Sequence, residues 1–327
     1  MPQRSIGGAK AMSRPTIIVN NLVSRVHLYT AAAITAHVYD RGTGKNLDSR
    51  NGTVFIMKGR TGLYFVTNRH VLEDDQAPSG IDSIEISGHF QSEEDPGAAP
   101  VPWTYTHKRP EVVFHSDAHT DLALIPHPEY SPRFGSPAEP PVCWSASNTW
   151  APMTHEMGWL ASEAELQQLQ PGDQVFIAGY PGVAYVGGNG RSANKDDKPI
   201  IVSGIVASDS RYPATFGDAT LHNAVLCQSF SWGGMSGAPV FGFSKSIGIT
   251  KIVGVNAGHI KGQGPAGGVI SHFVRSSALV DLLVELGEPS PQPLTMTTRH
   301  QTPPTQIDLS RLEWHLETEE ELNQGNC

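Results

Sequence analysis

The chain has 327 residues, more than one ordinary domain, and 39% of them are hydrophobic, which is enough to form a core. Its 33 glycines, 25 prolines and low charged fraction of 17% favour short strands joined by many turns over long helices. The formal net charge of −9 disfavours nucleic acid and anionic membranes as partners.

The N-terminal part of the chain carries no clear targeting signal. Residues 1–14 form a loose, mildly basic arm without the apolar core of a signal peptide. Leu28–Val38 is the nearest candidate for a membrane span, but it is far shorter than the roughly 20 apolar residues required. A secreted protein would usually carry several paired cysteines, and this chain has three. We therefore expect a soluble, cytoplasmic protein.

Residues 15–130 form the first strand-rich half of the chain. Runs of β-branched and aromatic residues alternate there with Pro, Gly, Asp and Ser, which break regular structure. This pattern predicts strands at Thr53–Lys58, Leu63–Thr67, Ile84–Ile86, Val101–Tyr105, Val112–His115 and Leu122–Ile125.

Residues 131–171 change in composition and are interpreted as a connection or insertion, with a helix over Ser162–Leu169. The second strand-rich half, 172–286, ends in apolar residues at helical spacing, which predict a closing helix over 273–286. Residues 287–327 begin as a Pro-rich linker and end as an acidic segment, in which the apolar residues of 307–323 are expected to dock on a partner protein or on the body of the chain itself. Strands are expected at Gln174–Ala178, Ile200–Ala207, Ala224–Gln228, Ala238–Phe243, Ile252–Asn256 and Gly268–Ser271.

The segment around Ser236 has the pattern of an activated serine. A serine hydroxyl is a weak nucleophile at neutral pH and needs an adjacent base. Its attack on a carbonyl leaves negative charge that backbone N–H groups stabilise. Gly234 and Gly237 permit the sharp backbone turn that aims such groups. The pattern predicts Ser236 as the nucleophile, with the N–H groups of Gly234 and Ser236 as the oxyanion hole.

Two further segments supply a base and an acid in the order His, Asp, Ser. The hairpin that ends at Thr67 is followed by a short polar turn that can present the imidazole of His70 at a rim. Asp121 lies at the mouth of an apolar strand, where a half-buried carboxylate can orient a histidine and stabilise its charged form. We predict a triad of His70, Asp121 and Ser236.

These segments together resemble the trypsin-like peptidases, most closely the disulfide-poor bacterial branches of the high-temperature-requirement and glutamyl endopeptidase types. The resemblance covers residues 50–285, with the histidine motif at Phe65–Val71, the aspartate motif at Asp121–Ile125 and the serine motif at Gly234–Val240. It implies an all-β fold of two antiparallel β-barrels with the active site between them. It also implies a serine endopeptidase that hydrolyses proteins or peptides through an acyl-enzyme, without cofactor or metal.

One position departs from the family members that are activated by cleavage. Those members carry an aspartate just before the nucleophile, where it pairs with a newly freed N-terminus. Met235 stands at that position here, so this activation route is absent.

The resemblance also implies which residues line the substrate pocket. Phe230 stands where trypsin-type enzymes carry a carboxylate, so we expect small or medium apolar side chains to bind before the cleaved bond. A strong preference for cleavage after Lys or Arg would refute this expectation. The pocket residues are expected to be Phe230, Ser231, Asn256, Ala257 and Gly258.

Two other interpretations compete with an active serine peptidase, and a third concerns which residue is its acid. His115, Asp117, His119 and Asp121 alternate and could be metal ligands, but a zinc site needs three or four converging ligands and no second cluster has comparable spacing. Asp117 is the alternative acid of the triad. A catalytically silent protease fold that binds peptides or acts as a scaffold would have no need of the complete triad.

Overall fold

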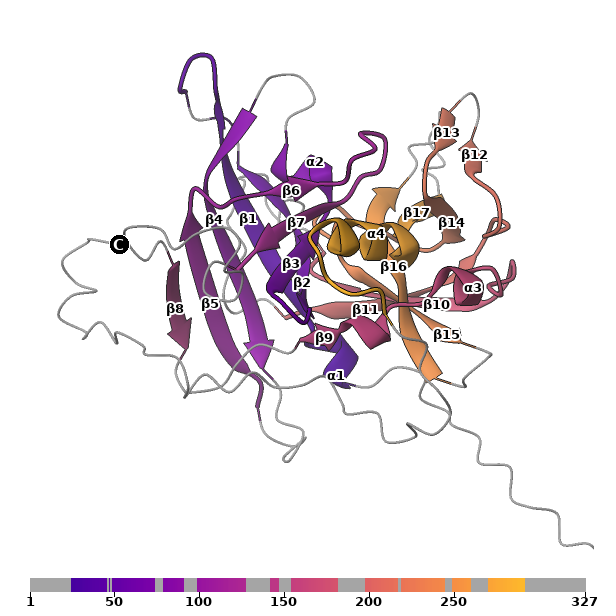
Figure 1. Cartoon of the computed structure of the whole chain (residues 1–327). Helices are drawn as coiled ribbons and strands as arrows, with labels where there is room; N and C mark the ends of the chain where they lie inside the picture. The colour runs from indigo at the N-terminus through magenta and orange to yellow at the C-terminus, as the bar shows by residue number, and fades with distance from the viewer. Residues whose placement is uncertain are drawn as a thin grey trace, which may run out of the picture.

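The computed structural model describes residues 25–45, 47, 49–73, 79–90, 99–127, 142–146, 154–181, 198–216, 219–244, 249–259 and 270–291. Within them, two strand-rich units lie side by side, the first in indigo to magenta and the second in orange (Figure 1). The N-terminal arm and residues 292–327, where a docking segment was expected, lie outside the described residues.

The first unit is a nine-stranded sheet in which every pair is antiparallel except β2 with β9. Its main path runs β6-β7-β3-β2-β1-β4-β5-β8, and in the described part of the chain its two edges do not pair. The expected connection between the units contributes two of these strands, β8 and β9. The strands are β1 (Ala31–Asp40), β2 (Arg50–Lys58), β3 (Leu63–Thr67), β4 (Ser79–Phe90), β5 (Val101–Lys108), β6 (Val113–Phe114), β7 (Ala123–Pro126), β8 (Val142–Ala146) and β9 (His155–Glu156).

The second unit is a closed antiparallel barrel of six strands, ordered β10-β11-β14-β17-β16-β15. This closure confirms the all-β class that the sequence predicts. A small hairpin of β12 (Ala214–Phe216) and β13 (Ala219–Leu221) extends from it. The barrel strands are β10 (Gln174–Gly179), β11 (Ile200–Val206), β14 (Ala224–Gln228), β15 (Pro239–Ser244), β16 (Ile249–His259) and β17 (Ile270–Arg275).

Strand β2 has consecutive apolar residues instead of alternating apolar and polar ones, and its position explains why. Successive side chains of a strand point to opposite faces of the sheet. Val54 and Ile56 pack inside the first unit, whereas Phe55 and Met57 pack in a second core that also contains Phe241 of the second barrel. Both faces of β2 are therefore buried, one within its own unit and one between the two units.

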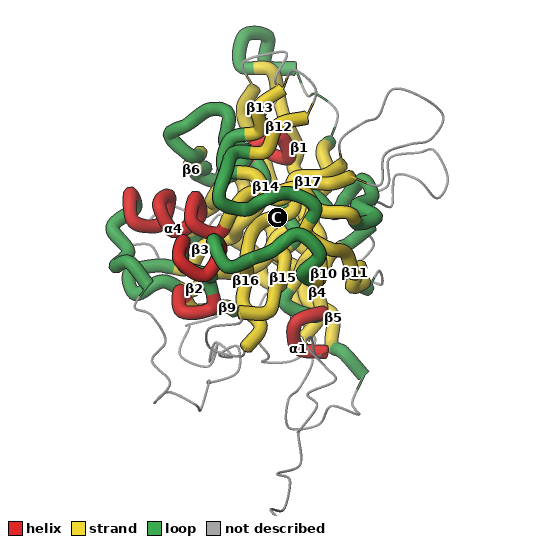
Figure 2. Tube along the Cα trace, turned by 90° about the vertical axis from the view of Figure 1, so that its right-hand side faces the viewer, coloured by secondary structure: helices red, strands yellow, loops and turns green. Residues whose placement is uncertain are grey.

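The described part of the chain has four short α-helices, of which Figure 2 shows α4 and α1 at the margin of the strands. They are α1 (Arg25–Leu28), α2 (Arg69–Leu72), α3 (Glu163–Leu166) and α4 (Ser276–Glu285), and a 3-10 helix covers Met157–Trp159. Among the described residues, none of the helices has the length and apolar character needed to cross a bilayer.

Two of these helices show how the local sequence sets their position. Ser162 and Glu165 form a capping box that starts α3, so the expected helix begins one residue later than predicted. Helix α4 buries Leu279, Leu282 and Leu283 in the core between the units.

Glu288 ties the end of α4 back to the first unit. Its side chain is only 2% exposed. The carboxylate accepts hydrogen bonds from the backbone N–H of Arg60 at 2.6 Å, from the backbone N–H of Thr61 at 3.0 Å and from the hydroxyl of Tyr64 at 2.8 Å. Burial raises the pKa of Glu288, but these hydrogen bonds lower it by more, so the buried carboxylate stays charged at neutral pH.

Replacing Glu288 with alanine is expected to lower the free energy of unfolding by about 3 kcal/mol, because several buried donors lose a charged acceptor at once. Urea denaturation followed by circular dichroism measures this change. The control is Asp281→Ala, an exposed acid on α4, which is expected to leave the midpoint unchanged. A Glu288→Ala midpoint equal to that of the control would show that the contact contributes little.

Candidate active site

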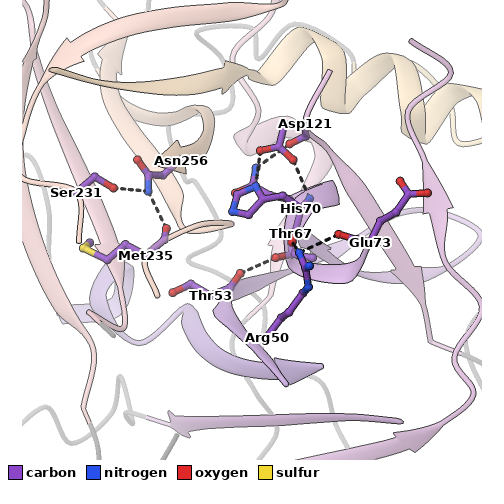
Figure 3. Close-up of polar contacts among 10 residues, drawn as sticks. Arg50, Thr53, Thr67, His70, Glu73, Asp121, Ser231, Met235 and Asn256 are labelled. Carbon is purple, nitrogen blue, oxygen red and sulfur yellow. Dashed lines mark hydrogen bonds and ion pairs between the residues drawn. The ribbon is translucent and has the colours of Figure 1, made fainter. Parts of the chain in front are cut away.

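His70 and Asp121 are joined by two hydrogen bonds at the edge of the first unit (Figure 3). His70 lies in helix α2, directly after β3, and its Nδ1 is 2.6 Å from Oδ2 of Asp121. The other carboxylate oxygen accepts the backbone N–H of His70 at 3.0 Å. A charged carboxylate can only accept, so it holds the ring proton on Nδ1 and leaves Nε2 to act as a base.

The short helix that carries His70 is braced by its neighbours. Arg50 donates to the carbonyl of His70 at 2.9 Å and to that of Glu73 at 3.0 Å, satisfying groups that a helix end leaves open. Asn68 is 0% exposed and donates to the carbonyl of Asp121 at 2.7 Å. Arg50 therefore braces the helix of the base, and the buried Asn68 braces the segment of the acid.

The Asp121 loop also contacts the second barrel. Asn223, which has a φ of 50°, donates its side-chain amide to Oγ1 of Thr120 at 2.9 Å. Asp117 instead accepts from the backbone N–H of His119 and the hydroxyl of Thr120. Asp121 rather than Asp117 thus bonds the His70 ring in the described part of the chain.

Three consecutive backbone carbonyls in the loop around Ser236 each accept a hydrogen bond. The carbonyl of Gly234 accepts from Oγ1 of Thr53 at 2.7 Å, and that of Met235 accepts from Nδ2 of Asn256 at 2.8 Å. The carbonyl of Ser236 accepts the backbone N–H of Thr53 at 2.7 Å. Peptide carbonyls and N–H groups point in opposite directions, so these bonds determine which way the N–H groups of the loop face.

Gly237 allows the loop to approach the first unit. Its φ is 88°, and a Cβ placed on it would lie 2.1 Å from the carbonyl oxygen of Thr53 and 2.3 Å from Oγ1 of Thr67. Any side chain at this position would push the two units apart, which explains the glycine that follows the serine.

The two N–H groups predicted to form the oxyanion hole bond no acceptor among the described residues. Within the described residues, no acceptor binds the N–H of Gly234 or of Ser236, whereas the N–H of Met235 between them donates to Trp232. The loop therefore leaves two donors for an external oxygen, as an oxyanion hole requires.

A chain of contacts links the Ser236 loop to the His70 helix. Ser236 bonds Thr53, the carbonyl of Thr53 accepts from Oγ1 of Thr67 at 2.9 Å, and Thr67 lies three residues before His70. Figure 3 accordingly shows the His70 ring between Asp121 and the Met235 segment. No hydrogen bond joins the Ser236 hydroxyl to the His70 ring in the described part of the chain, and such bonds often tighten only when substrate binds.

The expected pocket residues differ in how deeply they are buried. Ser231 and Asn256 are buried and bonded to each other at 3.0 Å. Ala257 is 8% exposed, and Gly258 lies beside Ser236, because a Cβ built on it would be 3.8 Å from Oγ of Ser236. Phe230 is 63% exposed, so its ring does not form the closed, dry floor expected from its position in the sequence. The preference for apolar side chains stays a prediction.

Two residues near the site were missed by sequence analysis. Thr53 belongs to the histidine motif region, yet its contacts with the serine loop come from the fold. His272 of β17 is near the pair: burial lowers its pKa, and the charges of Asp121 and His70 act on it. No sequence motif marks His272, and only the pairing of β17 with Gly258 of β16 brings it there.

The remaining residues to consider are the possible metal ligands and Cys227. No group of three or more His, Cys, Asp or Glu residues placed to hold a metal ion occurs among the described residues. Cys227 is a free, buried thiol whose pKa is raised by burial, and it lies 3.1 Å from Oγ of Ser271. Cys227 thus belongs to the core of the second barrel.

Comparisons with known proteins agree with the fold. The family described as the trypsin-like peptidase domain matches residues 52–247, more than half of the chain. A solved structure similar to this chain is the protease domain of MamO from Magnetospirillum magneticum in its apo form, with 19% identity, 78% of this chain and 96% of that chain covered, and a TM-score of 0.38. No curated protein matches. The chain belongs to the family of trypsin-like peptidase domains.

Proposed function

We propose that the protein is a serine endopeptidase that uses His70, Asp121 and Ser236 as its catalytic triad. The observation that carries the proposal is the His70–Asp121 pair facing a serine loop whose Gly234 and Ser236 N–H groups have no acceptor within the described residues. The peptidase family to which the chain belongs supports the same chemistry.

The geometry supports a two-step reaction. Nε2 of His70 takes the proton from the Ser236 hydroxyl as its oxygen attacks the peptide carbonyl, and the N–H groups of Gly234 and Ser236 stabilise the oxyanion. His70 then gives that proton to the leaving amine, which breaks the C–N bond and leaves an acyl-enzyme. Water, deprotonated by His70, releases the acid and restores the serine. Asp121 holds the orientation of the imidazole and stabilises its charged form.

A fluorophosphonate probe distinguishes this proposal from a catalytically silent, peptide-binding fold. The probe reacts only with an activated serine, so we expect stoichiometric labelling that mass spectrometry places on Ser236. The Asp121→Asn variant should label much more slowly, because the imidazole then loses the partner that orients it. Peptide binding without any labelling would favour the silent fold instead.

The substrate is a protein or peptide, and we propose that a small or medium apolar side chain precedes the cleaved bond. No acidic residue is present among the expected pocket positions to bind Lys or Arg. A peptide-library cleavage profile measures this preference directly.

A protein partner at the C-terminal segment and a cytoplasmic location remain separate proposals. The Glu288 contact determines how the partner proposal must be tested, since a truncation before that residue would also remove its bonds to Arg60 and Thr61. A chain ending after Pro291 keeps them. Loss of a co-purifying partner from this shorter chain, with cleavage retained, is the supporting result.

A further inference from the structure

The serine loop contains two adjacent glycines, Gly233 and Gly234, and therefore needs external contacts to keep one conformation. Glycine adopts positive and negative φ with similar ease. Gly234 has a φ of 88°, and Gly233 is exposed. Without restraints, the peptides beside them could rotate and turn their N–H groups away from the oxyanion position.

No charge at position 235 can supply that restraint. Met235 is 0% exposed and packs in the core of the second barrel with Ala238 and Val240. A thioether forms no ion pair, so the loop is held by neutral hydrogen bonds alone at the place where cleavage-activated relatives use an aspartate.

Thr53 supplies bonds to the loop from the first unit. Its backbone N–H holds the Ser236 carbonyl, while its hydroxyl donates to the Gly234 carbonyl at 2.7 Å and accepts from the backbone N–H of Tyr180 at 3.1 Å. The hydroxyl thus joins β2 to the loop and to the end of β10. The N–H of Met235 donates to Trp232 at 3.0 Å, so the peptide that follows Gly234 is held on both sides.

Asn256 supplies the matching bond from the second barrel. Asn256 is 0% exposed, and its side-chain amide donates to the Met235 carbonyl and to the Ser231 hydroxyl. The Met235 carbonyl that it holds belongs to the same peptide as the N–H of Ser236. Because the two groups of a trans peptide are antiparallel, this bond directs the Ser236 N–H to the opposite side.

We propose that Thr53 and Asn256 are positioning residues that hold the oxyanion loop in its catalytic conformation in the intact chain, in place of an activating ion pair. The inference rests on the proposed peptidase function. Thr53 holds the peptide between Gly234 and Met235, and Asn256 holds the next peptide, which carries the Ser236 N–H, so together they fix the backbone on which the oxyanion donors depend.

The main test compares Thr53→Val with Thr53→Ser. Valine keeps the shape and the backbone N–H of Thr53 but removes the hydroxyl, whereas serine keeps the hydroxyl. We expect Thr53→Val to lower kcat by about 10- to 100-fold with KM nearly unchanged, and Thr53→Ser to restore most of the rate. Thr35→Val is the matched control, because Thr35 is also buried and donates a single hydrogen bond, to Asn51 at 2.9 Å.

Asn256→Leu provides an independent variant with similar shape and no donor, and the same fall in kcat is expected. Melting temperatures of all variants separate this effect from unfolding, since a merely structural role would lower stability in Thr53→Val and Thr35→Val alike without changing kcat selectively. Wild-type kcat in both Thr53→Val and Asn256→Leu would overturn the proposal.

Crystal structures of the wild type and of Thr53→Val test the loop without any need for activity. The expected result is that the Gly234 carbonyl has turned away from residue 53 in the valine variant only, and an unchanged loop would contradict the proposal. A wild-type chain that neither cleaves peptides nor reacts with fluorophosphonate would instead refute the peptidase function, so the two failures are distinguishable.

Discussion

Replacing Ser236 with alanine is expected to reduce kcat for peptide hydrolysis by about 10⁴- to 10⁶-fold, while substrate binding changes little. The variant removes the only atom that forms the acyl bond but leaves its backbone N–H in the oxyanion hole. The bonds from Thr53 and Asn256 to the loop carbonyls do not involve the Ser236 side chain, so the fold should be retained.

The measurement is steady-state hydrolysis of a fluorogenic peptide, with fluorophosphonate labelling in parallel. Ser203→Ala is the matched control, because Ser203 is exposed on β11 of the same barrel. Near-normal turnover by Ser236→Ala would assign the activity to another residue or to a contaminant, and the proposed mechanism would then be wrong.

Acid is expected to unfold the protein well above the pH at which surface carboxylates alone would do so. Burial lowers the pKa of His27 and His107 from 6.5 to about 4. Burial, with the charge of a neighbouring histidine, lowers the pKa of His127 and His155 to about 3. In the unfolded chain all four return to about 6.5.

The sign of this pH dependence follows from the protons that the unfolded chain binds. Above pH 6.5 these histidines are neutral in both states, so they do not affect the pH dependence of folding. Below it the unfolded chain binds protons that the folded chain excludes, which lowers stability by about 1.4 kcal/mol per pH unit for each histidine. The free energy of unfolding of a domain is about 5–15 kcal/mol in total. We therefore expect acid unfolding between about pH 4 and pH 5.5.

His155 provides the sharpest variant for this prediction. It is 0% exposed among Phe55, Trp159 and Phe241, and neither of its ring nitrogens has a hydrogen-bond partner within the described residues. His155→Phe should therefore move the unfolding midpoint to lower pH when followed by intrinsic fluorescence. The control is His259→Gln at an exposed histidine, and an equal shift in both would contradict the role of burial.

The strands with a clear local pattern were predicted well, and those set by tertiary contacts were not. The expected strand Leu63–Thr67 matches β3 as observed. Strand β1 was not identified, because its residues from Ala31 to Ala36 are buried on both faces and show no alternation of apolar and polar residues. Strands β8 and β9 join the first sheet from the segment expected to be a connection, and only the partner strands β5 and β2 reveal this.

The same distinction applies to the site. The motif around His70 and the position of Asp121 predict their contact, and the structure shows it. The role of Asn256 was predicted from family geometry as a pocket wall, whereas its buried amide bonds the serine loop. The contact of Thr53 with Gly234 spans 181 positions in the chain, so no local pattern could indicate it.

The carboxylate of Glu288 has a consequence for the order in which the protein matures during synthesis. The turn between β2 and β3 emerges from the ribosome early, but the acceptor for its N–H groups at Arg60 and Thr61 is made 227 or more residues later. A nascent chain can therefore form most of the first sheet and still present open donors at this turn. The turn between β2 and β3 thus receives its carboxylate acceptor only after residue 288 has been added.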